Sequence, residues 1–325
     1  MKPLQPSRKF EPKRQPVRLF RPSPPRPQKR EPDWPALYRQ MGLSVTVCIA
    51  VKAHMDGCIV TVSDKRLSYG DELGAADNAA MKTLPIGNRW GVLWAAEDIS
   101  PVSDLIKEIH YQLHDKPNAD RATVQEIVAK AYNEAAQRRA ADQYLACYGV
   151  HSVAEFRKTG LAEFGPELFG QIMEKISSYD LGIQLLVHGF SPPPYHSFMH
   201  IFEVRNPGIC FDHQVEGYGV IGSGSMLALS SMMSHSGGFG TIEEAVYRAL
   251  EAKFMAETAS GVGRATTAAI HTPHGHISHV SPGVVDQIRA VWEATRKQEI
   301  PDDAWSVLHE SLKSLNDAIQ TPPVT

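Results

Sequence analysis

The sequence is poor in cysteine and contains no long hydrophobic run. Its four cysteines, Cys48, Cys58, Cys147 and Cys210, show no close paired spacing. Cys48 and Cys58 lie within apolar segments, so we expect reduced core residues rather than disulfides or metal ligands. No apolar run is long enough to span a membrane, and the first residues lack the apolar stretch of a signal peptide. These absences favour a cytoplasmic protein.

The chain also lacks a large net charge and the common cofactor motifs. The formal net charge is −3 over 325 residues, which gives no reason to expect nucleic acid as a partner. The sequence contains no Walker A loop, no Rossmann fingerprint, no zinc motif and no internal repeat. We therefore expect neither a metal nor a cofactor. Hydrophobic content of 42% and charged content of 21% are ordinary for a soluble protein.

The first 40 residues differ in composition from the rest. They hold ten of the 23 prolines and eleven Lys or Arg against three Asp or Glu. Such a segment buries too little apolar surface to offset its ordering entropy. We expect a disordered Pro/Arg-rich arm over 1–44, one folded domain over 45–292 and a helical tail over 293–325. The arm can be a basic docking segment, a solvated tail or no part of the mature protein.

Apolar periodicity and turn residues predict strands, then helices, then strands. The expected strands are 45–52, 57–64, 81–86, 90–96, 182–190, 197–205, 209–220, 264–271 and 276–280. The expected helices are 101–113, 123–148, 166–177, one beginning after 225, 241–258 and 302–319. Residues 149–170 are expected to form an insert that leads into a short helix. Capping boxes are expected at Thr123 with Glu126 and at Thr241 with Glu244.

The region with the clearest chemistry is a predicted hairpin from Val45 to Arg66. Two β-branched runs flank a turn that ends in Asp56-Gly57, a strong hairpin signal. Pairing about a centre near Met55 places Thr46 opposite Asp64. A hydroxyl then lies beside a carboxylate. This matters because a threonine at an N-terminus can use its own α-amine as the base.

Several segments follow this hairpin in a familiar order. Together they resemble a proteasome β-type subunit, a member of the N-terminal-nucleophile hydrolases, over 45–289. The segments are T-V-C-I-A-V from Thr46, S-D-K-R from Ser63, the lysine segment at Lys82, R-W-G-V-L-W-A-A from Arg89, G-I-Q-L-L-V-H-G-F from Gly182, G-Y-G-V-I-G-S-G-S from Gly217 and E-T-A-S-G from Glu257.

The resemblance implies an α+β fold, a four-layer αββα sandwich, and a threonine-type amide hydrolase. It implies a peptidase that acts on peptide or amide substrates as a homo-oligomer, with an ATP-dependent unfoldase as a further partner. A non-peptidase amidase and an inactive structural subunit are the alternatives, because fold does not fix substrate. The implied site residues are Thr46, Asp64, Lys82, Ala96, Ser223, Glu257 and Ser260.

The roles of these residues follow from the resemblance and from simple chemistry. Thr46 is the nucleophile, Lys82 lowers the pKa of its hydroxyl, and Asp64 supplies the counter-charge. Ala96 offers its backbone N–H to the oxyanion, where the family usually has glycine. Ser223 binds the threonine amine, while Ser225 is expected to cap the next helix. The family more often has Asp at the position of Glu257.

Three alternatives remain open around these assignments. Ser44 competes with Thr46, although the hairpin would pair Ser44 with Arg66. Lys65 and Arg66 are expected at the surface or in packing. Four histidines over 271–279 suggest a metal site, but strand alternation about a turn at 273–275 favours different faces for them.

The proposed chemistry requires a free amine on Thr46. One route is cleavage between Val45 and Thr46, although the branched Val45 side chain crowds the scissile carbonyl. A second is translation from a start codon at Val45, followed by removal of the initiator methionine. A third outcome is an unprocessed arm, which would exclude the mechanism.

Overall fold

The structure is a computed structural model that describes 46–68, 75–76, 81–192, 194, 198–235, 239–259 and 261–295, with only the backbone of 67–68 and 75–76. The predicted arm, the predicted tail helix, Ser44 and Ser260 lie outside these residues. In the described part of the chain, no helix is both long enough and apolar enough to cross a membrane.

The described residues form a mixed α and β structure around two antiparallel sheets. The first sheet has the strand order β10-β1-β2-β11-β12 and the second β5-β6-β7-β8-β9. The strands of the first sheet are β1 (Cys48–Ala53), β2 (Cys58–Asp64), β10 (Tyr218–Ile221), β11 (Thr266–His271) and β12 (Ile277–His279). Those of the second are β5 (Thr83–Pro85), β6 (Trp90–Ala96), β7 (Ile183–Phe190), β8 (Met199–Arg205) and β9 (Ile209–Asp212). A short pair, β3 (Leu67–Ser68) and β4 (Ala75–Ala76), stands apart.

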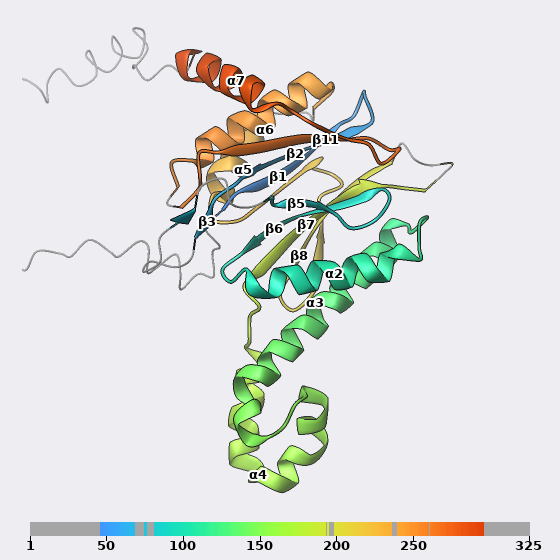
Figure 1. Cartoon of the computed structure of the whole chain (residues 1–325), viewed down its shortest axis with the longest axis vertical. Helices are drawn as coiled ribbons and strands as arrows, with labels where there is room; N and C mark the ends of the chain where they lie inside the picture. Colours follow the sequence, from blue (N-terminus) through green and yellow to red (C-terminus); the bar gives the residue numbers. More distant parts are fainter. Residues whose placement is uncertain are drawn as a thin grey trace, which may run out of the picture.

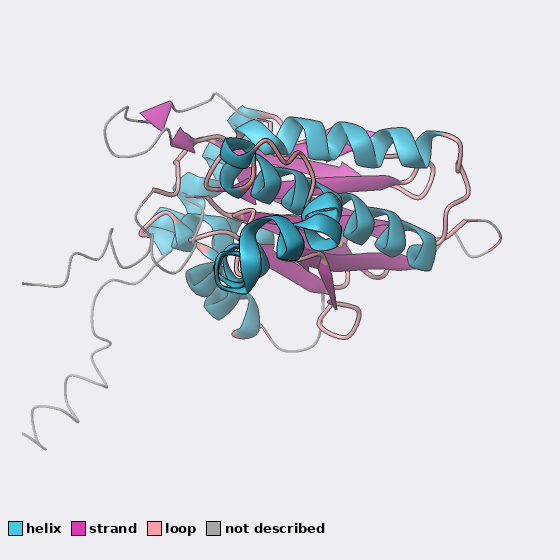
Figure 2. Cartoon of the chain, turned by 90° about the horizontal axis from the view of Figure 1, so that it is seen from below, coloured by secondary structure: helices cyan, strands magenta, loops and turns pink. Residues whose placement is uncertain are grey.

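Helices lie along the outer side of each sheet. The helices are α2 (Ser100–His114), α3 (Arg121–Tyr144), α4 (Val153–Ser177), α5 (Ser225–Met233), α6 (Ile242–Ala256) and α7 (Pro282–Thr295), with a 3-10 turn η1 (Ala146–Tyr148). In Figure 1, α6 and α7 lie above the first sheet and α2 and α3 lie below the second. Figure 2 gives the view from below, in which helices pass in front of the strands.

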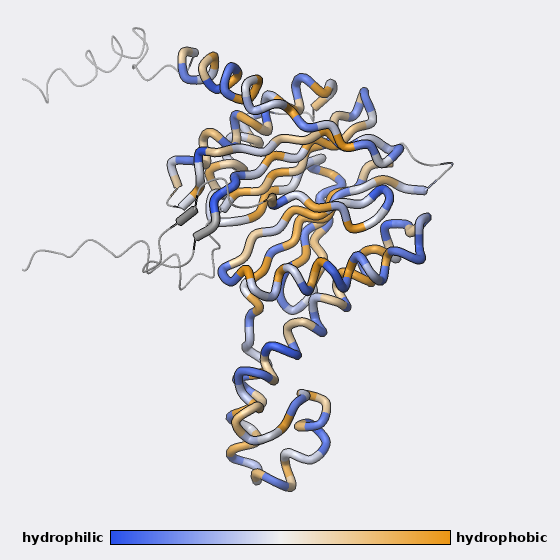
Figure 3. Tube along the Cα trace, in the orientation of Figure 1, coloured by the Kyte–Doolittle hydropathy of each residue, from blue (hydrophilic) through white to orange (hydrophobic). Residues whose placement is uncertain are grey.

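Three apolar clusters hold these parts together. One joins α2 and α3 to the second sheet, and another joins α5, α6 and α7 to the first. A third lies between the sheets, where Cys48 and Ile59 of the first meet Leu93 and Leu186 of the second. Figure 3 shows apolar residues gathered along the strands, as a buried sheet requires.

The predicted hairpin is present, but its predicted register was wrong by one residue. Cys48 pairs with Ser63, and Ala53 pairs with Cys58 across the turn 54–57. Extending this register aligns Val47 with Asp64, and the Asp64 N–H donates to the Val47 carbonyl at 3.2 Å. Thr46 therefore does not stand directly opposite Asp64. Because Thr46 precedes β1, its side chain need not follow the alternation of side chains between the two faces of that strand.

The predicted insert is helical over most of its length, and the helix begins earlier than the predicted 166–177. Helix α4 begins at Val153, is interrupted at Gly165, where φ is 73°, and continues after Pro166. A left-handed residue before a proline breaks the helical hydrogen bonding without unfolding the second half. The end of α3 and α4 enclose a separate small core around Phe156. They form an arm that projects from the body in Figure 1.

Three further predictions need correction, and one helix was missed. The N-cap of α3 is Asp120, which accepts from the Thr123 N–H, so Thr123 is inside the helix. The strand predicted over 209–220 is two strands, and β9 and β10 belong to different sheets. Ser225 does not cap α5, whose N-cap is Gly224. Helix α7 was not predicted. The cap of α6 by Thr241 is confirmed.

Candidate active site

The backbone of Thr46 is held by the turn before α5. The Thr46 N–H donates to Ser223 Oγ at 3.0 Å, and Ser223 Oγ donates to the Thr46 carbonyl at 3.3 Å. The Gly224 N–H donates to the same carbonyl at 3.0 Å. Ser223 therefore lies against the Thr46 backbone nitrogen, in the contact that the family resemblance implies.

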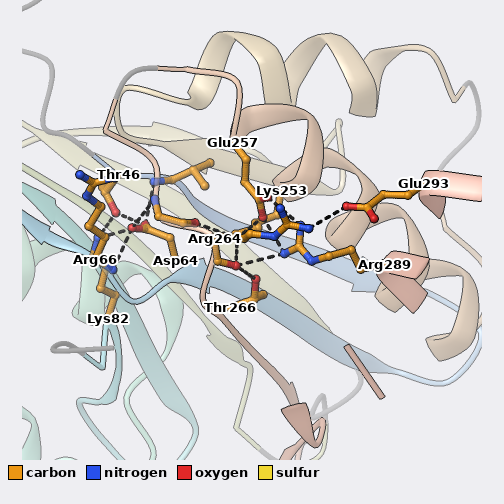
Figure 4. A network of polar contacts seen from close by, with 12 residues as sticks. Thr46, Asp64, Arg66, Lys82, Lys253, Glu257, Arg264, Thr266, Arg289 and Glu293 are labelled. Atoms are coloured by element: carbon orange, nitrogen blue, oxygen red, sulfur yellow. Dashed lines mark hydrogen bonds and ion pairs between the residues drawn. The ribbon is translucent and has the colours of Figure 1, made fainter. Parts of the chain in front are cut away.

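The Thr46 hydroxyl lies between an ammonium and a carboxylate. Lys82 Nζ donates to Thr46 Oγ1, and Thr46 Oγ1 donates to Asp64 Oδ1. Lys82 Nζ also lies 3.0 Å from Asp64 Oδ1, and both charged side chains are at most 2% exposed. Thr46 itself is 2% exposed. The three side chains predicted to act together are thus in mutual contact (Figure 4).

Backbone N–H groups complete the surroundings of the Asp64 carboxylate. Oδ1 accepts from the Val47 N–H at 3.0 Å, and Oδ2 accepts from the Arg66 N–H at 3.1 Å and the Gly263 N–H at 3.4 Å. Donors of this kind stabilise an ionised carboxylate where water is excluded. Asp64 is 0% exposed, so these contacts and Lys82 replace its hydration.

Gln184 was missed as a site residue. Its side-chain Oε1 accepts from the Gly222 N–H at 2.8 Å, and Gly222 precedes Ser223. Gln184 belongs to β7, and β7 pairs with β6, so this bond ties the second sheet to the turn that holds Thr46. A glutamine in an apolar strand between hydrophobic neighbours was the only available signal in the sequence.

Ala96 ends β6 beside the other site elements. It pairs with Ile183 and is partly exposed, which suits a backbone group that faces a substrate. Its role as the oxyanion donor stays a prediction.

Cys48 is the thiol next to the site. It is buried and free, and its Sγ donates to the Trp94 carbonyl at 3.3 Å. Burial raises the pKa of Cys48 to about 12, although nearby Lys82 opposes the rise. The thiol stays protonated near neutral pH and is not a thiolate nucleophile. The expectation of a reduced core cysteine is confirmed for Cys48 and Cys58.

Glu257 does not join the hydroxyl site directly. It is the C-cap of α6, and its carboxylate binds Lys253 and Arg289. Lys253 and Arg289 had not been singled out in the sequence. The expected contact of Ser260 lies outside the described residues.

The four histidines over 271–279 are spread along a hairpin. β11 and β12 pair around the turn that contains Gly275, where φ is 80°. His271 points into the core, where its Nε2 lies 2.8 Å from Thr61 Oγ1. The other three, His274, His276 and His279, are exposed. Over the ranges that the structure describes, no group of three or more His, Cys, Asp or Glu is arranged to hold a metal ion.

Comparisons with known proteins add no family to this geometry. A scan against protein-family models gives no match, and a search of curated proteins likewise gives none.

Proposed function

We propose that this protein is a threonine-type amide hydrolase, a proteasome-like peptidase with Thr46 as its N-terminal nucleophile. We read the two sheets and their outer helices as the four αββα layers of an N-terminal-nucleophile hydrolase. One observation carries the proposal: the Thr46 hydroxyl bonds both Lys82 and Asp64 in a buried site. A structural threonine on a strand has no need of two buried charges at its hydroxyl.

The chemistry is acyl transfer to the hydroxyl oxygen. Thr46 Oγ1 attacks the scissile carbonyl, and its proton passes to the free α-amine of the same residue, directly or through one water. The Lys82 ammonium favours the developing alkoxide, and Asp64 balances that charge. The Ala96 N–H holds the oxyanion. The protonated amine gives its proton to the leaving amine, and water then releases the acyl group and regenerates Thr46.

The reaction needs Thr46 to be the first residue of the working chain. An α-amine has a pKa of about 7.7–8.0, so a useful neutral fraction exists near neutral pH. The Ser223 hydroxyl, 3.0 Å from the Thr46 nitrogen, is placed to orient that amine. Cleavage between Val45 and Thr46 would generate this free α-amine. Translation from Val45, followed by removal of the initiator methionine, would generate it as well.

The decisive test determines the N-terminus and then removes the hydroxyl. Protein from its native source is subjected to N-terminal sequencing and intact-mass measurement. Two matched chains that both begin at position 46, the wild type and Thr46→Ala, are also prepared and assayed with a fluorogenic peptide library. We expect turnover with the wild type and none with Thr46→Ala. The substitution should lower the free energy of unfolding by only on the order of 1 kcal/mol. Equal turnover by both chains, or a native chain intact through Val45, contradicts the proposal.

We also propose that the protein works as a homo-oligomer. Helices α2 and α3 form the outer layer over the second sheet, and Tyr111 on α2 is 77% exposed. A large aromatic side chain in that position suits a subunit contact. Light scattering at micromolar concentration is expected to give a multiple of the mass of the chain that begins at Thr46, and less for Tyr111→Glu. Leu161→Glu, at an exposed position on α4, is the matched control. A monomer throughout contradicts this proposal.

A further inference from the structure

A buried charge cluster lies next to the site, between α6 and α7. Lys253 is 0% exposed and binds Glu257 Oε1. Arg289 of α7 is 7% exposed and forms a two-pronged pair with the same carboxylate, with Nη1–Oε2 at 2.6 Å and Nη2–Oε1 at 2.7 Å. The guanidinium also lies over the Phe254 ring, 4.1 Å from its centroid. The cluster is therefore fixed in both position and orientation.

The two cations of this cluster hold a stretch of backbone. Lys253 Nζ donates to the carbonyls of Gly263 at 2.9 Å and Arg264 at 2.8 Å. Arg289 Nη2 donates to the Arg264 carbonyl at 3.0 Å. Lys253 is thus shared between one carboxylate and two carbonyls. Figure 4 shows these contacts running from α7 toward Asp64.

The same backbone stretch reaches the Asp64 carboxylate. The Gly263 N–H donates to Asp64 Oδ2 at 3.4 Å, a long bond whose strength depends on where the backbone is held. A Cβ on Gly263 would stand 2.5 Å from the Arg66 Cβ, so the chain passes very close to the end of β2. Gly263 is therefore held through its carbonyl by Lys253 and contributes its N–H to Asp64.

We infer that Lys253, Glu257 and Arg289 are positioning residues that set the Gly263 backbone against Asp64 and make α7 part of the site. The inference rests on the proposed function for its catalytic meaning, because Asp64 matters through Thr46 and Lys82. None of the three touches the hydroxyl.

A purely stabilising role explains the cluster less well. Buried charges lose their hydration, and well-packed apolar side chains of similar size often give equal or greater stability. Burial lowers the pKa of Lys253 to about 8, against the opposing effect of Glu257, so the ammonium is held at a cost. A buried Lys253 ammonium is explained better if its N–H groups are needed to hold the backbone of Gly263 and Arg264 in one position.

The test follows the Gly263 amide by NMR hydrogen exchange in the full chain. Lys253→Met removes the donor to the Gly263 carbonyl, and Glu257→Gln is the milder variant if Lys253→Met fails to fold. Glu293→Gln is the matched control, because Glu293 of α7 also reaches this stretch, through an exposed pair with the Arg264 side chain at 2.9 Å. We expect exchange at Gly263 to rise at least about tenfold in the first two variants and less than about twofold in the control.

A second measurement separates positioning from general stabilisation. In chains that begin at Thr46, kcat for a fluorogenic peptide is expected to fall about tenfold in Lys253→Met with KM unchanged, while the amides of β7 keep their exchange rates. Unchanged exchange at Gly263 in both variants, or a wild-type amide protected less than about tenfold, overturns the inference. If exchange rises as expected but the wild type turns over no amide, the positioning stands and the proposed function fails.

Discussion

Gly222 lies against Thr46 so closely that a Cβ on Gly222 would stand 2.3 Å from the Thr46 carbonyl oxygen. Its φ is 95°, a conformation that other residues rarely adopt. The turn before α5 can therefore present Ser223 to the Thr46 nitrogen only because residue 222 has no side chain. The backbone approach and the polar contact are parts of one arrangement.

Gly222→Ala is expected to disrupt this arrangement. The substitution combines left-handed strain with a clash against backbone, which cannot rotate away, so we expect a loss of about 3 kcal/mol in the free energy of unfolding. The rate of peptide hydrolysis should fall as well. Urea unfolding and peptide turnover measure the two effects.

Gly57→Ala is the control for backbone strain alone. Gly57 has φ of 63°, but a Cβ there would meet nothing within 4 Å. We expect a loss of about 1 kcal/mol and unchanged turnover. Equal effects at both glycines would show that close approach to Thr46 is unimportant.

The second prediction concerns the Lys82–Asp64 pair. Lys82→Met leaves a buried carboxylate with only hydroxyl and backbone donors, and we expect a loss of about 3 kcal/mol in stability. Turnover is expected to fall about 100-fold or more through lost charge stabilisation. Arg121→Ala, which breaks an exposed pair with Asp212, is expected to cost less than about 1 kcal/mol.

A double-mutant cycle isolates the pair. The variant with both Lys82→Met and Asp64→Asn should lose less stability than the sum of the single losses, because the second change removes the charge that the first left unpaired. Strict additivity would mean that the two groups do not interact energetically in solution.

Local patterns in the sequence were sufficient to predict the hairpin, whereas its chemistry stays a proposal. The Asp-Gly turn and the β-branched runs predicted β1 and β2. The family resemblance predicted that Lys82 lies beside the Thr46 hydroxyl, and the structure has this contact. The register was wrong by one residue because the turn occupies 54–57 with no central residue. Thr46 still reaches Asp64, because residues before a strand need not follow its alternation.

The parts that failed depend on contacts distant in sequence. Arg289 and Lys253 are 36 positions apart, and neither has a local pattern that reveals a shared carboxylate. The segment 209–220 reads as one strand, yet its halves pair with β8 and β1 in different sheets. Strand propensity says nothing about which partner a strand takes.

The third prediction is that the α3–α4 arm unfolds separately from the site. Phe156 is fully buried in the core of the arm, so Phe156→Ala is expected to cost about 3–5 kcal/mol locally. Hydrogen exchange should rise in α4 while β1 and β2 stay protected, and turnover should persist. Leu161→Ala, at an exposed position, is the control. Lost protection at Thr46 and Asp64 would show that the arm supports the site.

The fourth prediction is acid sensitivity from a histidine pair between the sheets. His188 of β7 and His271 of β11 have ring centroids 4.3 Å apart and are 1% and 6% exposed. Burial lowers the pKa of His271 to about 4, with a smaller effect from His279, and burial beside His271 lowers the pKa of His188 well below its usual value. Both rings are therefore neutral in the folded protein near neutral pH.

The sign of the pH effect follows from proton binding. Between pH 6.5 and pH 4 an unfolded histidine takes up a proton while folded His271 does not. Falling pH therefore stabilises the unfolded state relative to the folded state. His271 alone should remove about 3 kcal/mol of stability across that window. The contribution is fully present above pH 6.5 and is lost as pH falls to about 4. Urea unfolding at pH 7, 5.5 and 4.5 measures this loss.

Removing the titrating rings should flatten the profile. His271→Gln keeps a polar partner for Thr61, and His188→Leu fits the apolar space between the sheets. Between pH 7 and 4.5, the double variant is expected to lose at least about 2–3 kcal/mol less in the free energy of unfolding than the wild type, whatever its stability at pH 7. His151→Gln, at an exposed position, should leave the profile unchanged. The same slope in the wild type and the double variant would show that other groups cause the acid response.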